Sequence, residues 1–189
     1  MPIRIGSFYT GIMKNHRVFL ILCVLLTVGS FVLFASDYDR GIGAQIGRLS
    51  GGGLSFYQEL NAASALQATV GLSLSSYPGD TSYFDYGLGV EYQKTFFSSS
   101  YQDWFETDLY WFVGLNHGGS VSWDGSGIQS PFTPSVGFGA GFGVEPVFLS
   151  HLSVPVSFGY GVFYTAEGST FVDMLDIAFL AQIGVRYRY

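Results

Sequence analysis

The chain of 189 residues is 48% apolar and 18% aromatic but only 12% charged, and it carries a net charge of −6 and one cysteine. Soluble domains have about a quarter charged residues, and this aromatic content excludes a disordered chain. One cysteine excludes a disulfide framework, and three histidines beside it exclude a zinc-finger site, so we expect neither a metal nor a cofactor. Only five basic residues follow residue 36, which excludes a nucleic-acid binder because phosphate contacts need Lys and Arg.

The N-terminal segment has the pattern of a secretory signal peptide. Lys14, His16 and Arg17 precede an apolar run over residues 18–34, which small and then acidic residues follow. A basic head, an apolar centre and small residues before a polar stretch are the parts of such a signal. A single-pass anchor is the alternative, because a run of 17 residues reaches the lower limit for a spanning helix.

We expect cleavage, and therefore a signal peptide over residues 1–36 and a mature domain over 37–189. Met13 is a candidate for the true start, since the residues before it add nothing that the signal needs. Three of the eight basic residues lie in the signal and all 14 acidic residues lie beyond it, so the mature net charge is −9. That charge helps to keep the chain soluble during its passage across the periplasm.

The mature part alternates apolar with small or polar residues in eight segments. The last is the plainest, since Ile177 and Phe179 lie on one face and Gln182 on the other. The segments cover residues 40–49, 53–60, 66–75, 83–96, 104–116, 133–146, 152–165 and 176–189. Most of these lengths are close to the roughly 9–11 residues that a tilted strand needs to cross a bilayer.

The face opposite the apolar one decides between two all-β folds. In a soluble sandwich the polar face meets water and carries many charges. Here it consists mainly of Gly, Ser and Thr, which suit the interior of a narrow cylinder, whereas the large Tyr, Phe and Leu side chains of the other face suit lipid. We therefore predict an all-β fold, an eight-stranded antiparallel up-and-down transmembrane β-barrel preceded by a signal-peptide helix. A soluble periplasmic β-sandwich on an uncleaved anchor is the alternative.

The connections fit long outer loops and short periplasmic turns. Outer loops are predicted at 76–82, 117–131 and 166–175, periplasmic turns at 61–65, 97–103 and 146–151, and a short outer hairpin at 47–54. Trp123 lies in the longest loop, which makes that loop a candidate contact for an extracellular partner, although a solvated loop is the simpler interpretation.

The C-terminal sequence ends in a polar residue, a glycine and spaced aromatic residues, at Gln182, Gly184, Tyr187 and Tyr189. This ending resembles the C-terminal insertion signal of outer-membrane barrels. The resemblance implies contact with membrane lipid, recognition by the outer-membrane assembly machinery and a location in the cell outer membrane. Size and strand count extend the resemblance over residues 37–189 to small barrels of the OmpA, OmpX and OmpW kind, without a signature that selects one of them.

Ionisable side chains predicted to face the lumen are the first candidates for a functional site. They are Glu59, Asp85, Glu91, Glu106, Asp108, Glu145, Arg186 and Arg188. Buried charges need partners, and the strand order makes Glu145 and Glu59 candidates to pair with the two arginines. A structural ion-pair network is the simpler interpretation. A gate or ion site is the alternative, and the excess of acids would make an open path prefer cations.

The inward glycines leave space inside the barrel. Either Tyr57, Tyr110, Phe112 and Phe163 fill it, or it stays a cavity. The resemblance to OmpW-type barrels implies that such a cavity would take a small apolar ligand.

Catalysis has two weak candidates. Some small barrels modify lipid A, and the resemblance makes His151 and Ser153 a candidate His-x-Ser pair on one face, at the periplasmic end of the lumen. The other set, His117, Ser120 and Asp124, lies in one Gly-rich loop with nothing to hold it in place. We therefore expect no enzyme but a structural or interaction role, or passage of small solutes. A lipid-modifying barrel enzyme of the lipid A deacylase kind is the alternative.

Overall fold

The computed structural model describes residues 39–76, 82–123, 132–166 and 173–189. The expected signal peptide over residues 1–36, Asp124 and the middle of each long outer loop lie outside these residues. Residues 37–189 form one compact unit. In the described ranges, no helix is long and apolar enough to span a membrane.

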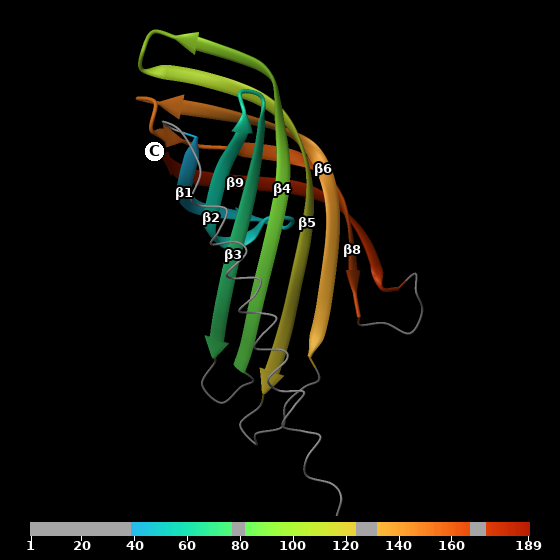
Figure 1. Ribbon diagram of the computed structural model, residues 1–189. Helices are drawn as coiled ribbons and strands as arrows, with labels where there is room; N and C mark the ends of the chain where they lie inside the picture. Colours follow the sequence, from blue (N-terminus) through green and yellow to red (C-terminus); the bar gives the residue numbers. More distant parts are fainter. Residues whose placement is uncertain (1–38, 77–81, 124–131, 167–172) are drawn as a thin grey trace, which may run out of the picture. The chain divides into compact units, whose positions relative to one another are not determined.

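The described residues form nine β-strands in one antiparallel sheet that closes into a ring (Figure 1). The strands are β1 (Arg40–Gly47), β2 (Gly51–Asn61), β3 (Ser64–Ser76), β4 (Ser82–Tyr101), β5 (Phe105–Trp123), β6 (Thr133–Phe148), β7 (Leu152–Ser153), β8 (Val156–Thr165) and β9 (Leu175–Arg188). The ring closes because β1 pairs with β9, from Gly41 opposite Arg188 to Gly47 opposite Gln182. The predicted all-β, antiparallel, up-and-down barrel is thus confirmed.

β7 and β8 occupy one position in the ring, because both lie between β6 and β9. Pro155, which has no backbone N–H to donate, lies in the break between them. Each of the eight predicted segments therefore corresponds to one position in the ring. We call the end where β1 begins and β9 ends the terminal end, and the other the distal end.

Several strands continue beyond the predicted boundaries. β4 runs to Tyr101 and β5 to Trp123, so residues 97–101 and 117–123 are strand and not connection. The predicted turns at 61–65 and 146–151 also contain strand residues, since β3 begins at Ser64 and β6 ends at Phe148. The Ser and Gly residues in these parts hid the alternation, but their backbone groups continue the hairpin ladder.

The apolar face of the sheet points outward. Its side chains include Ile46, Leu72, Leu115, Phe138, Phe142, Phe158, Tyr160, Ile177, Phe179 and Val185, all of them exposed. In the sandwich alternative these side chains would form the core, so the structure contradicts that alternative. Contiguous exposed apolar surface of this extent marks a membrane or protein contact.

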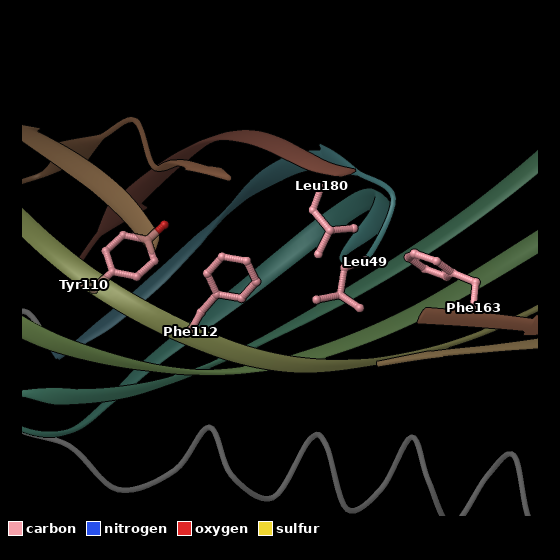
Figure 2. Close-up of a cluster of buried hydrophobic side chains, with 5 residues drawn as sticks. All are labelled: Leu49, Tyr110, Phe112, Phe163 and Leu180. Atoms are coloured by element: carbon pink, nitrogen blue, oxygen red, sulfur yellow. The ribbon is translucent and has the colours of Figure 1, made fainter. Parts of the chain in front are cut away.

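A small apolar core lies inside the ring and consists of Leu49, Tyr110, Phe112, Phe163 and Leu180 (Figure 2). Inward glycines make room for it. A Cβ at Gly143 would lie 2.3 Å from Cζ of Tyr110, and one at Gly137 would lie 2.5 Å from the ring of Phe163. Substitution of these glycines would require the aromatic rings to move. Around this core the inward glycines make room for aromatic side chains, which is the first of the two interpretations of the sequence, and they do not leave a cavity there.

Candidate functional site

Arg186 on β9 is one of the two most buried charged side chains among the described residues, with an exposed fraction of 2%. Its Nη1 lies 3.4 Å from both carboxylate oxygens of Glu145 on β6. Its Nη2 donates a 2.6 Å hydrogen bond to Oε1 of Gln67 on β3. The guanidinium carbon lies 4.1 Å from the centre of the Tyr57 ring on β2, a cation–π distance. Side chains from three other strands, β2, β3 and β6, therefore contact this one cation on β9.

A second ion pair involves Arg188, which lies two residues after Arg186 on β9 and so nearer the terminal end. Arg188 contacts the carboxylate of Glu59, and its guanidinium lies 5.6 Å from the centre of the Tyr57 ring. Asp108 accepts a 2.5 Å hydrogen bond from the Ser98 hydroxyl. The two arginines thus contact the carboxylates that the strand order offered as partners.

These groups surround a cavity of about 310 Å³ at the terminal end. Glu59, Glu106, Asp108, Glu145 and Arg188 line it, and Glu106 is the exposed member of the set. Carboxylates outnumber arginines here, so the cavity favours cations over anions. Among the described residues, no three His, Cys, Asp or Glu side chains are placed to hold a metal ion.

Glu91 is buried in the middle of the lumen and is held by amides. Its Oε1 accepts a 2.7 Å hydrogen bond from Gln182 and its Oε2 a 3.4 Å hydrogen bond from Gln93. None of the ion pairs among the described residues includes Glu91. The hydrogen bonds supply the compensation that a buried carboxylate needs.

Four inward glutamines connect these charges, and sequence reasoning missed three of them because they carry no charge. Gln67 donates to Gln45 and accepts a 3.1 Å hydrogen bond from Gln93. Gln182, which the sequence analysis named only for the insertion signal, donates to both Glu91 and Ser157. The alternation could have identified all four glutamines, since each of them falls on the small and polar face of its segment. The result is one hydrogen-bonded layer across the lumen.

The turn between β1 and β2 folds into the lumen on the distal side of this layer. The sequence predicted an outer hairpin at 47–54, but Leu49 and Ser50 are buried, Leu49 with an exposed fraction of 0%. The backbone N–H of Ser50 donates a 2.7 Å hydrogen bond to Oε1 of Gln182. Arg48 pairs with Asp176 at the start of β9, and its guanidinium lies 4.3 Å from the centre of the Phe163 ring. The chain turns where the outer hairpin was predicted, but the tip folds into the lumen because the glycines that face it leave room for it.

A second cavity, of about 340 Å³, lies on the distal side of this turn. Asp85, Asn116, Ser120 and Ser135 contribute polar groups to it, and Arg48 lies on its border. Asp85 is therefore separated from the other predicted lumen charges by the turn and the glutamine layer. Within the described ranges, the interior thus holds a polar cavity toward each end and a packed layer between the two.

The structure does not assemble a catalytic pair. Ser153 has an exposed fraction of 0%, and its hydroxyl has no hydrogen-bond partner among the described residues, so it does not donate to His151. The His151 ring stacks on Tyr187, which is exposed on the outer face, and its Nδ1 lies 3.2 Å from the carbonyl oxygen of Arg188. Alternation predicted that His151 would face the lumen. That is wrong because the turn before β7 redirects the chain through positive φ angles at Leu149 and Ser150.

The second catalytic set is divided as well. His117 and Ser120 lie on β5 and not in a loop; the ring of His117 contacts Tyr86, whereas Ser120 lines the distal cavity. Asp124 lies outside the described residues.

Gln182 and Gly184 of the predicted insertion signal face the lumen, whereas Tyr187 and Tyr189 are exposed. Whether these four residues direct assembly stays a prediction.

Comparison with solved structures shows which known fold the chain shares. No family model matches the chain, and no curated protein matches it. The N-terminal β-barrel domain of Pseudomonas aeruginosa OprF superimposes with a TM-score of 0.55 at 15% identity, covering 82% of this chain and 100% of that one. The fold is that of a small outer-membrane β-barrel.

Two further solved barrels are less similar. Ail, the attachment invasion locus protein of Yersinia pestis, has a TM-score of 0.42 at 15% identity over 79% of this chain and 96% of that one. Neisserial surface protein A has a TM-score of 0.39 at 17% identity over 79% of this chain and 94% of its own. At such identities the likeness concerns the fold alone.

Proposed function

We propose that this chain is an outer-membrane β-barrel with a closed lumen, which acts as a structural or interaction protein of the cell surface and not as an open pore or an enzyme. The observation that carries the proposal is the contrast between the two faces of the ring. Large apolar side chains cover the outside, and a packed, hydrogen-bonded layer fills the inside. An apolar exterior needs lipid around it, and a filled interior leaves no continuous path for solutes.

Three groups of contacts fill the middle of the barrel. Leu49, Phe112 and Leu180 form the apolar part, and Arg186 with Glu145 forms the charged part. Gln182 joins them, since it contacts both the β1–β2 turn and Glu91. Moving the turn would break buried hydrogen bonds as well as apolar contacts, which favours one closed state.

Conductance in planar lipid bilayers tests closure. We expect the refolded chain to insert without steady current steps, while an open porin in the same bilayer conducts. Steady steps from the wild-type chain would contradict a closed lumen.

The same preparation, mixed with outer-membrane lipid, tests for enzyme activity. We expect an unchanged lipid A profile both with the wild-type chain and with the His151→Ala/Ser153→Ala variant.

Passage of small solutes is the second candidate function, and the two cavities favour it. They lie on opposite sides of the β1–β2 turn, which the contact between Arg48 and Asp176 ties to β9. Displacement of the turn would join the two chambers into a path that prefers cations. Asp176→Ala removes the tie; under this second function it should produce cation-selective current, whereas under the first it leaves the bilayer silent.

A further inference from the structure

The β1–β2 hairpin is shorter than the strands on either side of it. β9 pairs with β1 only from Gln182 to Arg188, and β2 pairs with β3 only as far as Leu54 opposite Val70. In the part of the chain that the structure describes, residues 71–76 of β3 and 175–181 of β9 therefore have a strand partner on one side only. Figure 1 shows the hairpin ending part-way along β3.

We call the space between these two unpaired stretches of β3 and β9 the gap, and it lies at membrane depth. From Ile42, level with Tyr187, to Gly47 the hairpin makes five residue steps, which advance about 13 Å at a strand rise of about 3.4 Å and a tilt of about 40°. The apolar band of an outer-membrane barrel is about 25 Å tall. The outward side chains beside the gap are apolar, and Leu72 and Ile177 have exposed fractions of 72% and 75%. The two free edges thus continue through the upper part of the band.

Free backbone N–H and C=O groups cannot face lipid, because each unsatisfied group costs several kcal/mol in hydrocarbon. The chain's own hairpin cannot cover the edges. Only residues 48–50 connect Gly47 to Gly51, and two of them are buried inside the ring. Another strand is the element that satisfies both edges.

The edges suit each other in direction and length. β3 runs toward the distal end and β9 away from it, and six residues are free on one and seven on the other. Two copies that insert with the same orientation and face each other across a two-fold axis along the membrane normal place β3 of each copy beside β9 of the other, antiparallel. The lumen-facing side chains are Ser73 and Ser75 on the β3 edge and Asp176, Ala178 and Leu180 on the β9 edge. Ser73, Ser75 and Ala178 are small and uncharged and allow close approach there.

We propose that this chain forms a two-fold homodimer in which β3 of each copy pairs with β9 of the other over residues 71–76 and 175–181. The inference rests on the membrane location of the proposed function. It also explains the distal cavity, which is lined by β4, β5, β6, β8 and the β1–β2 hairpin but by no residue of β3 or β9. The second copy supplies the missing wall, and the two distal chambers become one.

Cysteine cross-linking of the full chain tests the dimer. Cys23 is the only cysteine and is replaced by alanine in every variant. One tagged chain carries Ser73→Cys or Ser75→Cys, a second chain with another tag carries Ala178→Cys, and the two are expressed together and oxidised in the membrane. We expect a band that carries both tags with at least one of the two serine variants, and no cross-linked band from any of these chains alone.

Ser135→Cys is the matched control, because it also faces the lumen but lies on β6, which is paired on both sides. It should form no mixed band with the Ala178→Cys chain. A heat-dependent gel shift of the monomer with no mixed band would overturn the dimer and leave the membrane barrel standing. Loss of the heat shift in the wild-type chain would overturn the membrane barrel itself, and the dimer with it.

Discussion

Replacement of Arg186 with methionine should destabilise the barrel by about 3–5 kcal/mol, the cost of removing one partner from a buried ion pair. The guanidinium lies 3.4 Å from the Glu145 carboxylate, an attraction of about 5 kcal/mol at an effective dielectric constant near 20. Methionine keeps much of the volume but leaves Glu145, with an exposed fraction of 3%, without its cation. Gln67 also loses its 2.6 Å hydrogen bond.

The free energy of unfolding is measured by reversible urea unfolding in phospholipid vesicles, followed by tryptophan fluorescence. The matched variant is Arg186→Met/Glu145→Gln, which removes both charges. It should be more stable than Arg186→Met alone, with a coupling energy of about 2 kcal/mol. A loss below about 1 kcal/mol for the single variant, the usual range of an exposed pair, would refute the buried network. Additive effects of the two substitutions would refute it equally.

Three further predictions concern packing and lipid contact. Gly143→Val should lower the yield of folded barrel on heat-shift gels, since its side chain would overlap Tyr110, and Tyr110→Ala should restore part of that yield; no effect of the valine would contradict the packed interior. Leu49→Ala should cost about 2–5 kcal/mol in urea unfolding, as a fully buried leucine does; a loss typical of exposed positions would show that the turn does not fill the lumen. Phe158→Arg on the outer face should cost about 2–4 kcal/mol in vesicles, and a neutral effect would place Phe158 outside the apolar band.

The strands could be predicted from the sequence because a barrel wall repeats one simple rule. Residues such as Ile177, Phe179 and Ile183 meet the outside while Gln182 meets the inside, so a period of two is visible without tertiary information. The rule failed where Ser and Gly fill both faces. The end of β5 looked like a loop for that reason, although its backbone pairs with β4 as far as Trp123 opposite Ser82.

The candidate site was predictable in part. Glu59 on β2 and Glu145 on β6 were candidate partners for the arginines because one strand position separates each of these strands from β9. The role of Leu49 was not predictable, because whether a short turn points to solvent or into the lumen depends on the space left by Gly114 and Gly139 on distant strands. The orientation of His151 was hidden for a similar reason, since it depends on backbone angles in the preceding turn.

The central claim is a closed barrel in lipid, and the most direct test is the gel mobility of residues 37–189 refolded in detergent and run both unheated and boiled. A closed antiparallel ring that resists the gel detergent predicts different mobilities for the unheated and boiled samples. Identical mobilities, together with a chain that stays soluble without detergent, would contradict the account and make the outward Phe, Leu and Ile side chains a core.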